Sequence, residues 1–262
     1  MLKNKAFKFR IYPTKEQEIL LSKTFGCVRF VYNKMLSDRI SHYQATGESL
    51  KNTPAQYKKE FEWLKEVDSL ALANAQLNLN NAYKNFFRDK SIGFPKFKSR
   101  KNNHLRYTTN CVNGNIKLDD GYLTLPKLKT VKIKQHRMVP EGYRLKSVTI
   151  SKTPTEKYFA SILYEYEKQI DIKKPKKFVG MDYSMKELFI TSNGISAEYP
   201  RYYRLSLERL KKEQRKLSKC ERGSNNRNKQ RLKVAKLHEK VANQRKDFLH
   251  KTSKQITNEF DG

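Results

Sequence analysis

The sequence predicts an α+β protein of more than one domain, on three observations. Residues 3–11 and several short segments between residues 105 and 167 alternate apolar and polar side chains, as half-buried strands do. Residues 14–88 instead repeat apolar residues at helical spacing, and two long charged helices are predicted after residue 203. A chain of 262 residues, 37% of them hydrophobic, can bury two modest cores, so we expect two or three domains.

The N-terminal strand is expected to place Phe7, Phe9 and Ile11 on one buried face, because side chains alternate along a strand. Further strands are predicted at residues 116–118, 122–125, 131–134, 145–151 and 158–166, with a turn at residues 119–121. Short strands at this spacing indicate a small β-barrel. The N-terminal strand is expected to join it, which gives a barrel domain of residues 1–12 and 93–170.

A helical region, residues 13–92, is expected to be inserted into this barrel. Thr14 and Gln17 form a capping box, which is typical of a helix N-terminus. The predicted helices are residues 14–36, 60–65 (with Trp63) and 69–88. The expected apolar side of the last helix consists of Leu70, Ala73 and Leu77.

Residues 93–106 (GFPKFKSRKNNHLR) combine two phenylalanines with six basic residues, counting His104, and no acid. Neither a helical nor a strand period is sustained, so a loop is predicted. Rings can stack on bases while cations displace counterions, a combination that suits single-stranded or irregular nucleic acid. A solvated basic linker whose phenylalanines fill a core explains the segment equally well.

The third predicted domain, residues 171–262, follows a linker at residues 168–177. Its run FVGMDYSMKELFITSNG, residues 178–194, is predicted to be an apolar strand with Asp182 in its middle, and Asn193-Gly194 suits a type I′ hairpin turn. Acidic side chains are disfavoured in strands. A strand with such a carboxylate resembles the start of an RNase H-like nuclease. A strand-edge carboxylate paired with a lysine is the alternative.

Two charged helices, residues 204–219 and 228–258, carry leucine, valine and phenylalanine at spacings of three, four and seven, which predicts an antiparallel hairpin. Residues 204–251 contain 17 basic and five acidic side chains, an excess of +12. Such an excess repels itself unless phosphates lie against it, so the hairpin is interpreted as a nucleic-acid surface. A solvated outer face is the simpler alternative.

The whole chain carries a formal charge of +30 and a pI near 10.0, which favours a polyanionic partner. No apolar run long enough to span a membrane and no signal peptide are recognised, so nucleic acid is preferred over a membrane as the partner. We expect a soluble cytoplasmic protein associated with the bacterial nucleoid. Cys27, Cys111 and Cys220 lie far apart and predict free thiols, without a disulfide or a zinc site.

Several blocks occur in the order of a known family. They are FKFRIYPTKEQ, VYNKML, NAYKNFFR followed by GFPKFKSR, VGMDYSMKELFITSNG, and the stretch from KLSKCERG to QRKDFLHK. Together they resemble TnpB (OrfB), the accessory protein of bacterial insertion sequences, which is similar to compact type V CRISPR nucleases. The resemblance extends over nearly all of the chain.

The resemblance implies an RNA-guided DNA nuclease built from a wedge-type β-barrel, an inserted helical recognition region and a RuvC domain of RNase H-like fold. In such proteins a guide RNA reads the target DNA by base pairing, while protein reads a short flanking motif and the heteroduplex backbone. The RuvC site of the family holds two Mg²⁺ ions with three carboxylates. Asp182 matches the first of these, which makes it the expected catalytic and metal-binding residue.

Two departures from the family pattern affect these expectations. Family members usually have Gly where this chain has Ser184. The second and third carboxylates of the family site have no counterpart in this chain. Glu259 and Asp261 are acidic but are not assigned as ligands. The RuvC site is therefore expected to be incomplete, to hold Mg²⁺ weakly or not at all, and not to cleave by itself. A truncated or decayed gene and a second polypeptide that completes the domain both remain open.

Guide RNA and target DNA are the expected partners. A catalytically silent RNA-guided repressor and a transposition protein that binds DNA without a guide are the alternatives. The cations predicted to contact nucleic acid are Lys96, Lys98, Arg100, Arg106, Arg215, Arg222, Arg227, Lys229, Arg231 and Arg245. The aromatic residues predicted to stack on bases are Phe94, Phe97, Tyr107, Tyr202 and Tyr203.

Overall fold

The protein was analysed as a computed structural model, which describes residues 1–101, 105–168 and 176–261. The chain forms two compact units, Met1–Gln169 and Ile170–Gly262. Residues 102–104 of the predicted basic loop and residues 169–175 of the predicted linker lie outside the described residues.

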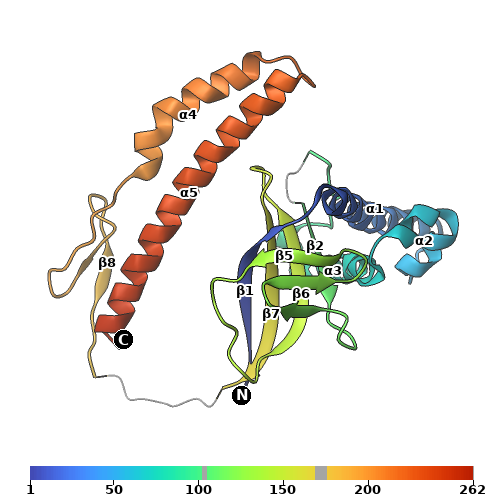
Figure 1. Cartoon of the computed structure of the whole chain (residues 1–262), viewed down its shortest axis with the longest axis horizontal. Coiled ribbons are helices and arrows are strands. Elements are labelled where there is room, and N and C mark those ends of the chain that lie inside the picture. The colour runs from blue at the N-terminus through green and yellow to red at the C-terminus, as the bar shows by residue number, and fades with distance from the viewer. Residues whose placement is uncertain (102–104, 169–175, 262) are drawn as a thin grey trace. The chain divides into compact units, whose positions relative to one another are not determined.

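The N-terminal unit contains a curved antiparallel sheet (Figure 1). Its seven strands follow the order β2-β6-β7-β1-β5-β4-β3. Its strands are β1 (Leu2–Tyr12), β2 (Leu105–Asn110), β3 (Lys117–Asp119), β4 (Tyr122–Leu125), β5 (Lys129–Lys134), β6 (Arg144–Lys152) and β7 (Tyr158–Glu167). Within the described residues β2 and β3 do not pair with each other, so the sheet is a curled half-barrel. The predicted β-barrel is confirmed only in part, as this half-barrel, and the helices of residues 15–46 and 69–88 pack against its edge strand β2.

The N-terminal strand β1 lies inside the sheet, between β7 and β5. Phe7 pairs with Ile162 of β7, and Ile11 pairs with both Tyr158 of β7 and Ile133 of β5. The predicted inward residues Phe7, Phe9 and Ile11 are all buried. One end of the chain is thereby fixed to strands more than 100 residues away.

The turn between β3 and β4 has the type I′ geometry that suits the right-handed twist of a two-residue hairpin. Asp119 pairs with Tyr122, and both central residues have positive φ, 39° at Asp120 and 74° at Gly121. Asp and Gly tolerate this region, which explains the predicted turn at this point.

Between β1 and β2 the chain is helical. The elements are α1 (Lys15–Thr46), α2 (Pro54–Glu60), the 3₁₀ helix η1 (Glu62–Glu66), α3 (Ser69–Arg88) and the 3₁₀ helix η2 (Lys90–Ile92). The capping box is confirmed: Gln17 N donates to Thr14 Oγ1 at 3.3 Å, and Thr14 N donates to Gln17 Oε1 at 3.0 Å. The predicted end at Leu36 was wrong, because neither Gly nor Pro occurs between Leu36 and Gly47, whose φ of 73° ends α1.

The bounds predicted for α3 are confirmed, but its predicted apolar side was wrong. The buried residues are Ala71, Leu72, Ala75 and Leu79. Leu77 is exposed, whereas the alanines at positions 71 and 75 allow α3 to pack closely on α1. The helix is thus rotated relative to the expected face.

The helices and the sheet of this unit share one continuous core, which includes Phe9 from β1, Leu21 from α1 and Leu72 from α3. The proposed division into a barrel (residues 1–12 and 93–170) and an inserted helical region (residues 13–92) therefore stays a prediction about the family architecture. It does not correspond to two separate cores.

Cys27 provides a direct test of this packing. Burial raises the pKa of its thiol to about 11, so the thiol stays protonated near neutral pH. We expect iodoacetamide to modify Cys27 much more slowly than the half-buried Cys220 in the native protein, and at a similar rate after unfolding in urea. Peptide mass spectrometry measures both rates, and rapid native modification of Cys27 would contradict the described core.

The C-terminal unit contains a two-stranded sheet and two helices. Its elements are β8 (Met181–Tyr183), β9 (Phe189–Thr191), α4 (Tyr202–Lys219) and α5 (Asn225–Glu259). The single strand predicted around Asp182 was wrong, because the chain reverses after Tyr183 and β9 pairs antiparallel with β8. In this reversal Ser184 Oγ accepts a hydrogen bond from Glu187 N at 3.3 Å.

The type I′ turn predicted at Asn193-Gly194 was also wrong. Only Gly194 of this pair has positive φ, 77°, and its N–H donates to Thr191 O at 2.9 Å. Thr191 N in turn donates to Ile195 O at 2.8 Å, so residues 192–194 form a three-residue loop that ends on a left-handed glycine. The predicted reversal is present with a different geometry.

Candidate nucleic-acid interface

The predicted antiparallel hairpin of α4 and α5 is confirmed, with Leu210, Val234 and Val241 buried between the helices (Figure 1). Gln230 is buried beside them, and its Nε2 donates to Glu213 O at 3.0 Å and to Glu213 Oε2 at 2.6 Å. This hydrogen bond is the main reason why the pKa of Glu213 lies below its usual value. A polar contact therefore fixes the register of the two helices.

Gln230→Ala is expected to destabilise the hairpin, because it removes two hydrogen bonds to Glu213 and leaves Lys216 as the remaining partner of that carboxylate. Since the pKa of Glu213 is lowered in the folded state, the stabilisation is present above the unfolded pKa and is lost as pH falls through the folded pKa. Hydrogen exchange of α4 and α5 measures both effects. The exposed Gln214→Ala is the matched control, and equal exchange in the two variants would contradict the assignment.

Arg227 has a structural contact in the turn of the hairpin. Its Nη1 donates to Leu217 O at 2.9 Å and to Cys220 O at 3.0 Å, carbonyl groups at the C-terminal end of α4. A cation at this position satisfies free carbonyls and complements the helix dipole. The contact of Arg227 with nucleic acid stays a prediction, and the fold gives this residue another role.

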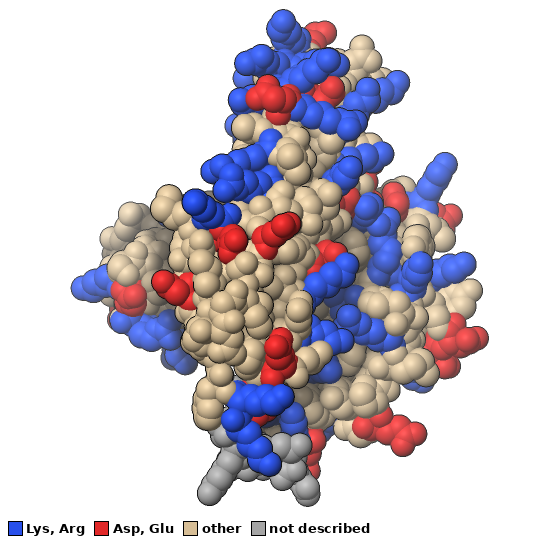
Figure 2. All heavy atoms as spheres, turned by 90° about the vertical axis from the view of Figure 1, so that its left-hand side faces the viewer, with Lys and Arg blue, Asp and Glu red and all other residues tan. Residues whose placement is uncertain are grey.

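The remaining predicted cations of the hairpin point outward. Figure 2 shows Lys and Arg side chains gathered over the upper end of the hairpin, with few acids between them. The predicted cations that are exposed along the two helices and their turn are Arg215, Arg222, Lys229, Arg231 and Arg245. Ion pairs of the hairpin include Lys211–Glu208 at 3.0 Å, Lys216–Glu213 at 3.3 Å and Lys251–Asp247 at 2.8 Å. Five acids cannot neutralise 17 cations, so a strongly positive surface results.

The two tyrosines at the start of α4 differ in their surroundings. The Tyr202 ring packs edge-on against the Phe248 ring of α5, with 6.4 Å between centroids. The Tyr203 side chain is exposed. Tyr203 is therefore the better placed of the two to stack on a base.

In the predicted basic loop, residues 93–101 are held close to the helices. Phe94 packs against Tyr83 and Phe86, with centroid distances of 5.5 and 5.4 Å. Lys98 N donates to Asn33 Oδ1 at 2.8 Å, and Asn33 Nδ2 donates to Lys98 O at 3.0 Å. Phe94 thus packs on the helices, as the alternative interpretation expects, whereas contact of the following cations with nucleic acid stays a prediction.

The ammonium group of Lys98 lies 3.9 Å from the centroid of the Tyr32 ring. The pKa of Lys98 is lowered mainly because its ammonium group is buried, and secondarily because the nearby Arg106 carries a charge of the same sign. Lys96, Phe97 and Arg100 are exposed beside it. A phosphate at this position would relieve the repulsion between neighbouring cations.

Arg106 and Tyr107 are consecutive in β2 and point to opposite faces. Arg106 is exposed, whereas Tyr107 is only 5% exposed and packs against Phe25 at 5.8 Å between ring centroids. The prediction that Tyr107 stacks on a base was wrong, because its ring belongs to the core and burial raises the pKa of its hydroxyl.

Asp182 lies in β8 opposite Ile190, and its side chain is exposed. Its Oδ1 accepts a hydrogen bond from Tyr183 N at 2.8 Å. The described parts of the chain contain no group of three or more His, Cys, Asp or Glu residues placed to hold a metal. One carboxylate does not supply the two-ion site of the family, so the described residues do not fit that site.

Asp261 has another role near the end of α5. Its Oδ2 accepts hydrogen bonds from the backbone N–H groups of Lys176 and Lys177 at 3.0 and 3.1 Å. The same residue donates its N–H to Lys177 O at 2.8 Å. These contacts fix the segment that leads into β8.

The outer face of the half-barrel carries a cationic and aromatic cluster that the sequence prediction did not include. Lys8 Nζ lies 4.6 Å from the Phe159 ring, and the Arg10 guanidinium lies 5.4 Å from Tyr12 and 5.5 Å from Phe159. Arg10 Nε is buried without a hydrogen-bond partner in the described residues. The alternation FKFRIY placed these cations outward, but Phe159 joins them only through the pairing of β1 with β7.

These features define a strongly basic α+β protein with surfaces suited to nucleic acid and one strand-borne carboxylate. A family profile described as "Probable transposase" (OrfB_IS605) matches residues 161–262, and one described as "Helix-turn-helix domain" (HTH_OrfB_IS605) matches residues 1–48. The chain belongs to the TnpB (OrfB) family of insertion sequences. In the structure, residues 1–48 form β1 and the single uninterrupted helix α1.

Relatives match almost the whole chain. A protein of Streptomyces pristinaespiralis named "Putative RNA-guided DNA endonuclease" is 36% identical over 97% of this chain, and the InsQ protein of Escherichia coli K12, with the same description, is 32% identical over 98%. The chain spans 64% of the length of each of these relatives. A shorter protein, virulence protein VsdF of Salmonella dublin, is 42% identical over 37% of this chain, and 93% of its own length is covered.

The fold is similar to that in a cryo-EM structure of a Cas12f1–sgRNA–target DNA complex. The TM-score is 0.55 at 10% identity, and the match covers 98% of this chain and 78% of the other. At this identity the likeness concerns the fold alone. No helix in the described part of the chain is long and apolar enough to cross a membrane.

Proposed function

We propose that this chain binds a guide RNA and, through that RNA, a complementary target DNA. The observation that carries the proposal is the outward-facing cationic surface of the α4–α5 hairpin, with its excess of +12 over residues 204–251. The names of the two long relatives and the likeness to the fold of Cas12f1 support the same activity. A DNA-binding role of this kind would place the protein with the nucleoid in the cytoplasm.

The proposed contacts follow from exposure. Lys96, Arg100 and Arg106 in the N-terminal unit and the five exposed cations of the hairpin bind phosphates, which supply affinity without sequence information. Phe97 and Tyr203 are exposed rings that can stack on unpaired bases. The same proposal includes the family architecture: a wedge-type barrel, an inserted recognition region and a RuvC domain that begins at residue 171. In this architecture base pairing with the guide RNA reads the DNA sequence.

For catalysis, the proposal is limited to one residue, Asp182. Mg²⁺ bound at a RuvC site activates water and stabilises the leaving oxygen, and Asp182 would supply one of the carboxylates needed. The described residues place no others beside it. Cleavage would therefore require carboxylates from outside the described residues, and no cleavage step is assigned to these residues themselves.

Asp182→Asn is accordingly expected to leave the affinity for RNA and for DNA within about twofold of the wild type, because removal of one exposed carboxylate does not alter the cationic surfaces. Fluorescence anisotropy with labelled oligonucleotides at fixed salt measures this. Asp119→Asn, another strand carboxylate, is the control. A large loss of affinity in Asp182→Asn alone would show that this residue supports binding rather than metal coordination.

The proposed guide is tested by sequencing RNA that co-purifies with the protein after a high-salt wash. We expect one discrete RNA species transcribed from the end of the element that encodes the protein. A random sample of cellular RNA would contradict guidance and favour a transposition protein that binds DNA without a guide.

A further inference from the structure

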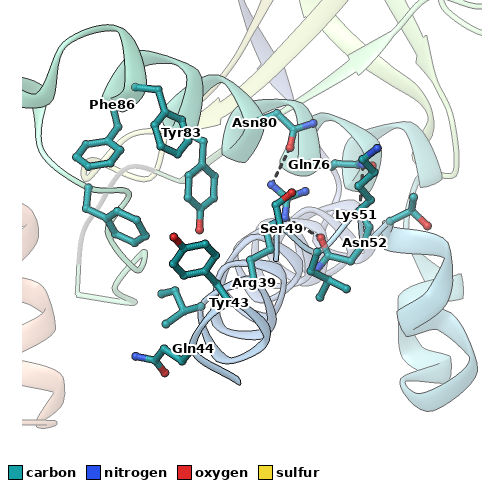
Figure 3. A pocket seen from close by; sticks show the side chains of 15 residues that line it. Arg39, Tyr43, Gln44, Ser49, Lys51, Asn52, Gln76, Asn80, Tyr83 and Phe86 are labelled. Carbon is teal, nitrogen blue, oxygen red and sulfur yellow. Dashed lines mark hydrogen bonds between the residues drawn. The ribbon is translucent and has the colours of Figure 1, made fainter. Parts of the chain in front are cut away.

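The helical part of the N-terminal unit contains an apolar pocket of about 860 Å³ (Figure 3). The C-terminal half of α1 forms one wall, α3 forms the other, and residues 49–53 and Phe94 close its ends. This volume lies within the range of ligand sites in proteins, about 300–1,000 Å³. The core residues of the helices do not fill it, so the pocket is available to an external group.

One side of the pocket is aromatic. Tyr83 and Phe87 are nearly parallel, with 6.3 Å between centroids, and Phe86 meets Phe94 edge-on at 5.4 Å. Tyr43 extends from α1 toward Tyr83 across the opening (Figure 3). Tyr43 is 62% exposed and Phe87 is 73% exposed, although both carry large apolar surfaces. Clustered rings left open to solvent are typical of a binding site.

The other side of the pocket is polar and fixed. Arg39 Nε donates to Asn52 Oδ1 and Arg39 Nη1 donates to Asn80 Oδ1, both at 2.8 Å (Figure 3). Asn52 is itself 3% exposed and donates to Tyr57 Oη at 2.8 Å, and Gln76 Nε2 donates to Asn52 O at 3.2 Å. The guanidinium is therefore held in one orientation before any ligand arrives.

Arg39 carries an uncompensated charge in this setting. Its two hydrogen-bond acceptors are neutral amides, and within the described residues it forms no ion pair. Its guanidinium lies 5.7 Å from the centroid of the Tyr83 ring. A ligand that combines a flat aromatic system with electron-rich acceptors would satisfy both features.

We propose that this pocket binds an unstacked nucleobase of a single-stranded segment of nucleic acid. Tyr43, Tyr83 and Phe87 offer faces for stacking, the Arg39 guanidinium provides hydrogen-bond donors, and the amides of Gln76 and Asn80 provide edges that can read a base. The exposed Lys51 at the opening can contact the adjoining phosphate. A purely apolar group would offer no acceptor to the remaining N–H groups of the guanidinium, so a base, which combines a flat ring with acceptors, is favoured.

This inference rests on the proposed function and deepens it. The proposed function involves contacts with the phosphate backbone of nucleic acid, and the pocket adds a contact with a base. The test compares two labelled probes of equal length and charge, a single-stranded oligonucleotide and an abasic strand with the same sugar-phosphate backbone. Fluorescence anisotropy gives the affinity of the full chain for each probe over a series of salt concentrations.

Tyr43→Ala and Phe87→Ala are the test variants, since both residues are exposed and their loss leaves the core intact. Tyr122→Ala, an exposed tyrosine of β4 outside the pocket, is the matched control.

We expect the wild type to prefer the probe with bases, and each pocket variant to bind that probe about 10-fold more weakly while retaining its affinity for the abasic strand. The control should match the wild type on both probes. Equal losses on the two probes, or no loss in either variant, would overturn the base pocket. Loss of a co-purifying protein in the pocket variants, with unchanged affinity for the probes, would assign the pocket to a protein partner instead.

The proposed function and the pocket fail in distinguishable ways. Absence of salt-dependent binding to either probe by the wild type would reject nucleic-acid binding itself, whereas failure of the pocket alone leaves abasic binding and its salt dependence in place. As a second readout, ultraviolet crosslinking of a 4-thiouridine probe should label peptides containing Tyr43 or Phe87. Labelling confined to the hairpin would contradict the pocket.

Discussion

Replacement of Arg215, Arg222, Lys229, Arg231 and Arg245 with glutamine is expected to weaken binding to RNA by about 10²–10⁴-fold at about 0.1 M salt. Each phosphate that a cation neutralises contributes a slope of roughly 0.7–0.9 to the dependence of log affinity on log salt. Loss of five such contacts should therefore reduce that slope by about 4. Anisotropy titrations between about 0.05 and 0.2 M salt measure both quantities.

The control variant has the same change in net charge, made at other positions of the chain. Lys15, Lys59, Lys65, Lys90 and Lys127 are exposed lysines of the N-terminal unit, outside the proposed contacts, and are changed to glutamine together. Both variants carry a formal charge of +25 instead of +30. If the two bind RNA equally weakly, net charge rather than the hairpin surface determines affinity, and the assignment of the hairpin fails.

Phe9→Ala is expected to destabilise the N-terminal unit by about 3–5 kcal/mol, a large part of the total stability of a typical domain. Phe9 is 1% exposed in the central strand β1, stacks on Phe7 at 6.3 Å between centroids and meets His136 at 5.3 Å. Removal of the ring leaves a cavity that surrounding strands, paired on both sides, can fill only in part.

Urea unfolding followed by circular dichroism measures this loss. Because the helices and the sheet share one core, both are expected to unfold together in the variant. Phe97→Ala is the control, since Phe97 is 56% exposed and its loss should change stability by less than about 0.5 kcal/mol. Equal effects of the two substitutions would contradict the position of β1 in the core.

The sequence predicted those parts of the fold that depend on local pattern. The bounds of α3, the strands β4 to β7 and the α4–α5 hairpin follow from periodicity, and the Asp120-Gly121 turn follows from the tolerance of these residues for positive φ. The sequence pattern gave a wrong prediction where the chain reverses its direction. Apolar residues on both sides of residues 184–188 look like one strand, because alternation alone does not show that β9 folds back on β8.

The short helix α2 was missed for a related reason. Its seven residues begin with Pro54, and so few residues show no clear helical period. Its position depends on tertiary contacts, such as the hydrogen bond of 2.7 Å that Tyr57 Oη donates to Asp38 Oδ2 of α1. The sequence did contain a start signal that the prediction overlooked, Thr53 and Gln56 at capping-box spacing with Pro54 at the first helical position.

The candidate site was predicted in its chemistry rather than its geometry. The cationic segments and Asp182 were recognised from residue types, but burial of Tyr107 depends on the packing of α1 and α3 over β2. The contact of Arg227 with the end of α4 requires the turn of the hairpin. The pocket around Arg39 joins residues of α1, α3 and Phe94 that are distant in sequence, so no local pattern could have shown it.

The most direct test of guided binding is the affinity of the purified protein–RNA complex for two DNA duplexes. One duplex contains a sequence complementary to the co-purifying RNA, and the other contains the same bases in scrambled order. Our account predicts tight, RNA-dependent binding to the complementary duplex and binding to the scrambled duplex that is weaker by at least about 10³-fold, the usual scale of specific over non-specific recognition. Equal affinity for both duplexes, unchanged after digestion of the RNA, would contradict it.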